Sequence, residues 1–496
     1  MNKVRRGLAF ALLGLTFQTV AFASGVTIVT HGFNADMVWV NAMADGIAKR
    51  SGTPGVDVTR VNLVVTQSGS NLLVSMSPVS VAPDAAFSTG EFVIGLDWTA
   101  IDSFARPGEE MPAPADQESV PTQNVAQAVL AYLDAWMYGG KSVLAHPIHL
   151  IGHSRGGALV ASLARYMGER GVWADQLTTL DPYPVSLFGD AATTVPSSVV
   201  FADNLWQDSA FPSGKALGGA FNQHLGLLGS SSNNHSLVHT FYFGTIDTAA
   251  TGDGDCTSCI SPAWYTTDID VHSRSQTGFW YSRVGGGDRA GAQAGAGLLS
   301  SLGGSAVVGT NGRTAVTVTQ PAWPNVFRVH TVEDVVTPID PNSTAFYYQS
   351  SSASVQVSAY AADDHNPSHG GLLLGTIALG PAASPTAASL AWSVIPPARV
   401  QPYSIYLAVT GNGRTRYAYD AGLVTVNGIP SCPGDLNHDG QVDDTDFVSF
   451  AAAYDILDCA DPSMPASCPA DLNGDGLVDD SDFVIFASAY DALVCP

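Results

Sequence analysis

The chain has 496 residues, of which 46% are hydrophobic and only 13% charged, so we expect several domains with sizeable cores. Acidic residues outnumber basic ones by 44 to 20, which gives a formal net charge of −24. This balance argues against a protein that holds nucleic acid or anionic membranes through a basic surface.

The first residues have the order of a secretion signal. Basic side chains at positions 3, 5 and 6 precede an apolar run from 8 to 20, and Ala21-Phe22-Ala23 has the small-residue pattern of a cleavage site. We therefore predict a signal peptide over residues 1–23 and a secreted or cell-surface protein, with no transmembrane anchor after signal removal. An uncleaved anchor is the alternative.

From residue 24 to about 285, short apolar runs alternate with helical patterns. Strands are expected at 26–30, 92–98, 148–151, 177–181 and 199–204, and helices at 38–48, 124–138 and 158–167. Alternation of this kind predicts an α/β domain in which a mostly parallel sheet has helices on both faces.

The motif Gly152-His153-Ser154-Arg155-Gly156 joins the third of these strands to a helix. A serine on such a strand–turn–helix is held in a strained, exposed position, and the amide of the next residue, Arg155, points to where an oxyanion would form. The sequence His31-Gly32-Phe33 after the first strand offers the amide of Phe33 as a second oxyanion donor. The bland alternative is a glycine-rich turn whose serine caps a helix.

An acid and a histidine follow the serine in chain order. Asp181 ends a strand at Leu180-Asp181-Pro182, and His235 lies in a loop that leads into an aromatic helix. Serine needs a neutral imidazole to take its proton, and a carboxylate fixes the tautomer of that ring. We predict Ser154, Asp181 and His235 as a catalytic triad, with Asp203 as the alternative acid and His239 as the alternative base.

Taken together, the motifs at His31-Gly32-Phe33, Leu96-Asp97-Trp98, 152–157, 180–182 and Asn234-His235 resemble the pancreatic-type lipase branch of the α/β-hydrolases. The resemblance covers about residues 25 to 245. It implies a serine esterase or lipase that needs no metal for catalysis, and it favours Asp181 as the acid.

Two features depart from that family. Arg155 stands where the family usually has an aliphatic residue, and a disulfide-bonded lid is not recognisable between Asp203 and Asn234. Plain esterase action is therefore an alternative to lipase action on an interface. Polyester, phospholipid or amide substrates remain open as well, as does an inactive adhesion or scaffold protein that keeps the fold.

The middle of the chain has two further regions. Residues 286–322 are rich in glycine and alanine and are predicted to be a linker. Short alternating runs separated by turn residues follow over 323–428 and predict a β-sandwich. Cys256 and Cys259, in a polar loop before the linker, are predicted to form a disulfide.

Residues 432–496 contain an acidic pattern that occurs twice. Each copy places oxygen ligands at the positions of a calcium-binding EF-hand loop, with a backbone carbonyl at the seventh position, and an amphipathic helix follows. The expected calcium ligands are Asp435, Asn437, Asp439, Gln441, Asp443 and Asp446 in the first copy, and Asp471, Asn473, Asp475, Leu477, Asp479 and Asp482 in the second.

The two copies resemble a type I dockerin, because aspartate stands at position twelve and no helix precedes either loop. The resemblance implies structural Ca²⁺ and a cohesin-like or cell-surface anchoring partner. Two cysteines bracket each copy, which predicts one disulfide within each: Cys432 with Cys459 and Cys468 with Cys495. Ordinary dockerins lack these cysteines.

Overall fold

The protein is described by a computed structural model covering residues 25–51, 59–78, 91–102, 120–138, 141–265, 274, 277–281, 312–319, 323–337, 341–363, 367, 370–399, 401–427, 433–437, 441–465 and 468–492. The predicted signal peptide and residues 286–311 of the predicted linker lie outside these ranges. In the described part of the chain, no helix is long and apolar enough to cross a membrane.

The described residues fall into two compact units. The first comprises those within Met1–Val332, Ser343–Ser393 and Tyr403–Leu423. The second comprises those within Glu333–Asn342, Val394–Pro402 and Val424–Pro496.

A large sheet forms the centre of the first unit, in the spatial order β10-β9-β8-β7-β1-β4-β2-β3. Its neighbours pair in parallel, apart from the antiparallel pair β2 and β3. The prediction of a mostly parallel α/β sheet is thereby confirmed, and the antiparallel pair is an addition to it. The strands are β1 (Val26–Thr30), β2 (Thr59–Ser68), β3 (Asn71–Pro78), β4 (Phe92–Asp97), β7 (Ile148–His153), β8 (Ala174–Leu180), β9 (Val199–Trp206) and β10 (Phe221–His224).

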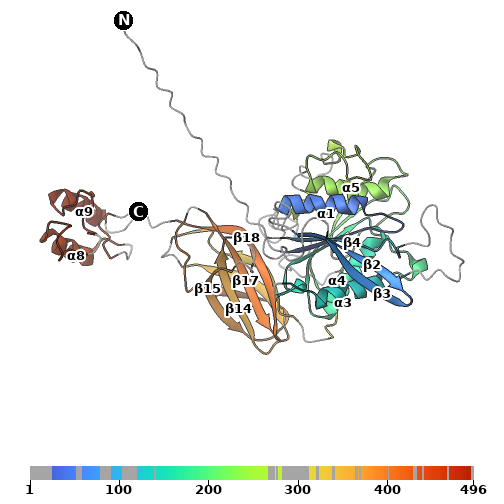
Figure 1. The fold of residues 1–496 in the computed structure, drawn as a ribbon, viewed down its shortest axis with the longest axis horizontal. Coiled ribbons are helices and arrows are strands. Elements are labelled where there is room, and N and C mark those ends of the chain that lie inside the picture. Colours follow the sequence, from blue (N-terminus) through green and yellow to red (C-terminus); the bar gives the residue numbers. More distant parts are fainter. Residues whose placement is uncertain are drawn as a thin grey trace, which may run out of the picture. The chain divides into compact units, whose positions relative to one another are not determined.

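Helices cover both faces of this sheet (Figure 1). On one face, α3 (Thr122–Ala135) and α4 (Arg155–Glu169) pack on a core that includes Ile28. On the other, α1 (Val38–Ser51) and α5 (Asn234–Ile246) pack on a core that includes Val29. Successive residues of a strand point to opposite faces, so a strand covered on both sides is buried along its whole length, as β1 is.

Short elements lie around the sheet. They are the two-stranded pair β5 (Met137–Tyr138) and β6 (Lys141–Ser142), and the 3₁₀ turns η2 (Val143–Ala145), η3 (Ser186–Phe188), η4 (Pro262–Tyr265) and η6 (Gly278–Tyr281). Part of the predicted linker also packs here: the amide of Thr314 donates to the carbonyl of Val195 at 2.9 Å, and the amide of Thr319 to that of Glu169 at 2.8 Å.

Two separate, largely antiparallel sheets follow in sequence. One has the order β11-β13-β16 and the other β12-β18-β17-β14-β15. An α/β region followed by a β-rich region is thus the architecture of the chain. The strands are β11 (Asn325–Thr331), β12 (Val335–Val336), β13 (Ser343–Ser350), β14 (Val355–Ala362), β15 (Leu372–Leu379), β16 (Ala382–Ala391), β17 (Tyr403–Gly411) and β18 (Arg414–Val426).

Within the first unit, the β-rich region contacts the amino ends of strands of the large sheet. The ring of Trp173 stacks on Phe327 at 5.2 Å. Beside it, the buried guanidinium of Arg416 lies 3.2 Å from the carboxylate of Asp175, at the start of β8. These contacts lie at the opposite end of β8 from Asp181.

The C-terminal repeat pair packs around one shared apolar cluster in the second unit. Val442 and Phe450 of the first copy and Val478 and Phe486 of the second are all buried in it. The helices are α8 (Asp444–Tyr454) and α9 (Asp480–Ala492).

The predicted disulfides within each copy are wrong. Cys459 is bonded to Cys468, which joins the end of the first copy to the start of the second. The shared core explains this pairing, because it brings the end of one copy against the other: the amide of Cys459 donates to the carbonyl of Gly476 at 3.1 Å. Cys432 and Cys495 lie outside the described residues.

Candidate active site

Ser154 occupies the turn between β7 and α4 with a strained backbone. Its φ is 55° and its ψ −124°, a conformation that non-glycine residues rarely adopt. The turn is held on both sides, since the Ser154 amide donates to the carbonyl of Leu180 at 2.9 Å and its carbonyl accepts from the amide of Tyr183 at 3.0 Å. Strain that is fixed in this way is typical of a functional turn.

The segment that follows β1 lies directly against this turn. A Cβ atom on Gly32 would be only 2.6 Å from Cβ of Ser154 and 3.1 Å from the amide nitrogen of Arg155. A Cβ on Gly156 would be 2.2 Å from the carbonyl oxygen of His31. Only glycine allows this approach, which brings the segment of Phe33 beside the amide of Arg155.

Asp181 directly follows β8 and is fully buried. Its Oδ2 lies 2.6 Å from Nδ1 of His235 and accepts from Nε2 of Gln207 at 2.7 Å. Its Oδ1 accepts from the amides of Gln207 at 3.0 Å and Gly214 at 2.7 Å. Four hydrogen bonds satisfy the buried carboxylate and fix its direction.

His235 lies in the first turn of α5, not in the loop that the sequence suggested. Its Nδ1 faces Asp181, so the hydrogen bond to the carboxylate places a proton on Nδ1 and leaves Nε2 as the basic nitrogen. The structure therefore brings Asp181 and His235 into contact at the edge of the sheet where Ser154 stands.

His153, beside the serine, holds the backbone of His235. Its Nε2 lies 2.9 Å from the carbonyl of His235, an oxygen that can only accept, so Nε2 carries the hydrogen. Burial lowers the pKa of His153 well below its usual value, and the neighbouring rings of His235 and His239 lower it further. His153 is therefore a neutral support for the site.

Asp203 and His239, the alternative acid and base, interact with residues outside the Asp181–His235 pair. Asp203 accepts from Oγ1 of Thr178 at 2.6 Å and Nε2 of Gln176 at 3.2 Å. His239 pairs through Nδ1 with Oδ2 of Asp253 at 2.7 Å. Both groups are buried, and their partners are different from those of the Asp181–His235 pair.

The sequence did not point to Gln207 or to Asp190. Gln207 stands immediately after β9, at the same edge as Asp181, so the rule that polar residues at strand ends gather at one edge could have found it. Asp190 binds the Arg155 side chain from a loop, at 2.7 Å, and no motif marks it.

In the C-terminal repeats, the acid at position twelve is buried in both copies. Asp446 accepts from the amides of Leu436 and Asn437, and Asp482 accepts in the same way from Leu472 and Asn473. Each acid thus closes its own loop.

The second loop also brings carboxylates together. Asp471, Asp475 and Asp482 have ligand atoms within 4.8 Å of one another, and all of these atoms are oxygens, the donors that Ca²⁺ prefers. Asp439 of the first loop lies outside the described residues.

A comparison with models of known protein families and with curated proteins gave no match.

Proposed function

We propose that this protein is a secreted serine hydrolase that cleaves carboxylic esters. The observation that carries the proposal is the buried Asp181–His235 pair, with Oδ2 and Nδ1 at 2.6 Å, at the sheet edge where the strained turn presents Ser154. The Ser–Asp–His order and the turn resemble those of the pancreatic-type lipase branch of the α/β-hydrolases.

In the first half of the reaction, Ser154 Oγ attacks the ester carbonyl carbon while Nε2 of His235 takes its proton. The carbonyl π electrons become an oxyanion, which the amides of Phe33 and Arg155 stabilise. When the tetrahedral intermediate collapses, the bond to the alcohol oxygen breaks and His235 returns the proton to that oxygen. The alcohol leaves, and the acyl group stays on Ser154.

In the second half, water replaces the alcohol. His235 removes a proton from the water as the water oxygen attacks the acyl carbon. The bond between the acyl carbon and Ser154 Oγ then breaks, and His235 gives that proton to Oγ. The carboxylic acid is released and the serine is restored. Throughout, Asp181 holds the ring of His235 and stabilises its imidazolium form.

Exposed apolar side chains on the neighbouring loops support an apolar acyl group in the substrate. Phe33 carries one of the two predicted oxyanion amides, and Leu187 lies in the loop after β8. Phe211 lies in sequence between Gln207 and Gly214, two of the residues that hydrogen-bond Asp181. Their exposed fractions are 43%, 80% and 85%. Each belongs to a segment that follows the carboxyl end of a neighbouring parallel strand, β1, β8 or β9, so all three flank the same edge of the sheet, where an apolar acyl group would bind.

The test is hydrolysis of a p-nitrophenyl ester series from acetate to palmitate by the full chain. Ser154→Ala should abolish turnover, whereas Ser162→Ala, which changes a buried serine in the helix that follows Ser154, should preserve it. Turnover that rises with acyl length indicates a lipase, and turnover on short chains alone indicates an esterase. Turnover that survives Ser154→Ala would refute the triad.

We propose in addition that the C-terminal repeats bind Ca²⁺ and attach the enzyme to a cohesin-like or cell-surface partner. The support is the doubled loop pattern, which resembles a dockerin, together with the oxygen cluster of the second loop. Pull-down of a cohesin by the full chain in Ca²⁺, lost in EGTA, would test this attachment.

A further inference from the structure

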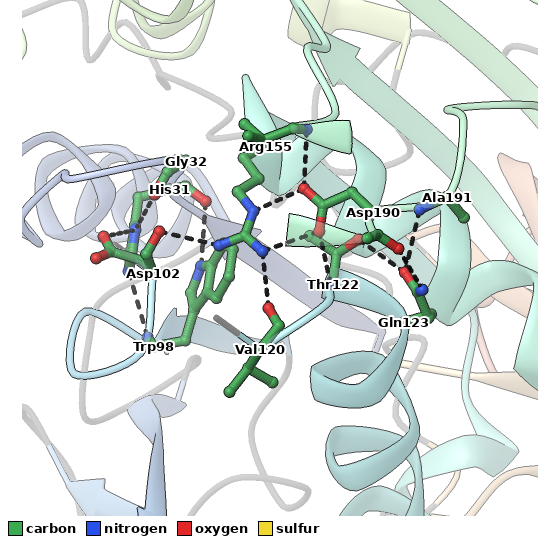
Figure 2. Close-up of polar contacts among 12 residues, drawn as sticks. His31, Gly32, Trp98, Asp102, Val120, Thr122, Gln123, Arg155, Asp190 and Ala191 are labelled. Carbon is green, nitrogen blue, oxygen red and sulfur yellow. Dashed lines mark hydrogen bonds and ion pairs between the residues drawn. The ribbon is translucent and has the colours of Figure 1, made fainter. Parts of the chain in front are cut away.

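Arg155 contributes more than a backbone amide to the site. Its side chain is fully buried, and its guanidinium lies among three groups from different parts of the chain: the carboxylate of Asp190 and the carbonyls of Asp102 and Val120 (Figure 2). We infer that the Arg155 side chain is a positioning residue that holds both oxyanion amides in register, an inference that rests on the proposed function.

The first contact is a two-pronged ion pair with Asp190. Nε and Nη2 of Arg155 lie 2.7 and 2.9 Å from the two carboxylate oxygens. The same carboxylate accepts from the amides of Thr122 and Val185, each at 2.9 Å. Fork-to-fork geometry fixes the direction of the arginine as well as its charge, so the start of α4 is tied to the loop after Asp181.

The second set of contacts reaches the segment that follows β4. Nη1 of Arg155 donates to the carbonyl of Asp102 at 2.9 Å, and Nη2 donates to the carbonyl of Val120 at 2.7 Å. The carboxylate of Asp102 in turn accepts from the amide of Ala35 at 3.1 Å and lies 3.5 Å from Nδ1 of His31. Asp102 therefore holds residues on both sides of Phe33.

An aromatic contact forms a second route to the same place. The guanidinium carbon of Arg155 lies 4.5 Å from the centre of the Phe188 ring, and that ring stacks on Phe33 at 5.5 Å. The Arg155 side chain is thus connected to Phe33 by way of Phe188, and to the residues on either side of Phe33 by way of Asp102. The two predicted oxyanion donors, the amides of Arg155 and Phe33, are linked through the guanidinium.

If the Arg155 side chain only stabilised the fold, it would not need to bond Asp190 and two backbone carbonyls at once. A buried ion pair is weak evidence for stability, and apolar residues of similar volume often replace it without loss. An aliphatic side chain at this position would fill space, but it would hold neither carbonyl. Removing both charges together therefore separates positioning from stability.

The test compares the wild-type protein with Arg155→Leu/Asp190→Leu, using p-nitrophenyl ester kinetics and the affinity for an alkyl boronic acid. The boronic acid adds to Ser154 Oγ as a tetrahedral adduct and places an oxygen where the oxyanion forms. We expect kcat to fall on the order of a hundredfold, with little change in KM, and boronate affinity to fall in proportion.

A milder variant covers the case in which the double variant does not fold. Arg155→Lys keeps the charge opposite Asp190, but its single nitrogen cannot also bond both carbonyls. We expect it to fold and to lose about tenfold in both kcat and boronate affinity. The matched control is Asp175→Leu/Arg416→Leu, which removes a buried pair at the amino end of β8 and should leave kcat unchanged.

Folded Arg155 variants with wild-type kcat and boronate affinity would overturn the inference. A fall in kcat without any fall in boronate affinity would overturn it too, because the loss would then lie outside the oxyanion site. If the wild-type protein itself neither cleaved esters nor bound the boronate, the proposed function would fail first, and this inference with it.

Discussion

Oδ2 of Asp181 lies 2.6 Å from Nδ1 of His235, although the two residues are far apart in sequence. The carboxylate is buried and receives three further hydrogen bonds, from Gln207 and Gly214, so its direction does not depend on the histidine alone. A carboxylate fixed in this way selects one tautomer of the ring that it faces.

We therefore predict that Asp181→Asn lowers kcat on p-nitrophenyl esters by roughly a thousandfold to ten-thousandfold. Asparagine has nearly the same volume, but its amide can donate to Nδ1 and so favour the wrong tautomer. Asp203→Asn is the matched control, because Asp203 is also buried yet accepts from Thr178 and Gln176. Equal losses in the two variants would contradict the assignment of Asp181.

A pH dependence of stability follows from His153. Burial, and then the rings of His235 and His239, lower its pKa well below the ordinary 6.5. As the pH falls below 6.5, the unfolded chain binds a proton at this residue while the folded protein does not. The free energy of unfolding should therefore fall with pH, by up to about 1.4 kcal/mol per pH unit from this residue.

His153→Gln removes the titrating group and keeps a donor for the carbonyl of His235. We expect urea unfolding at pH 7.5, 6.5 and 5.5 to show a shallower decline for the variant than for the wild-type protein. Parallel pH profiles would mean that His153 already binds its proton in the folded state.

Much of the fold could be predicted because it rests on local patterns. Strand–helix alternation predicted the mostly parallel sheet, and the glycines of 152–156 predicted the strained turn at Ser154, where φ is 55°. Asp181 was also predicted to orient His235, from the order of serine, acid and histidine along the chain, and the two side chains lie in contact at 2.6 Å. Their catalytic roles stay predictions.

What could not be predicted depends on contacts between distant segments. Nothing in the sequence around Asp190 indicates that it binds Arg155, because the pair forms only when the loop after β8 folds over the start of α4. The cysteine pairing failed for a related reason. Treating each repeat as self-contained ignores the apolar core that the two share.

The disulfide between Cys459 and Cys468 gives a direct prediction. A non-reducing peptide map should contain a fragment in which these two cysteines are joined. Cys459→Ser/Cys468→Ser should destabilise the repeats by about 2.5 kcal/mol, because the open chain gains conformational entropy when unfolded. A fragment that joins Cys459 to Cys432 would contradict the structure.

The oxygen cluster of the second repeat predicts that Ca²⁺ binding depends on Asp471 and Asp475. A bound Ca²⁺ offsets the repulsion between these carboxylates. Replacing both with asparagine should therefore lower the affinity for one of the two expected Ca²⁺ ions, or abolish its binding. Calorimetric titration of the full chain with CaCl₂ measures the affinity and the number of ions bound. Asp461→Asn is the control, because Asp461 lies outside the cluster and accepts a hydrogen bond from the amide of Ser463. Unchanged stoichiometry and affinity in the double variant would show that these aspartates bind no calcium. Loss of one bound Ca²⁺ in the double variant, but not in Asp461→Asn, would assign that ion to the second loop. The ion that remains would then be the one expected in the first loop.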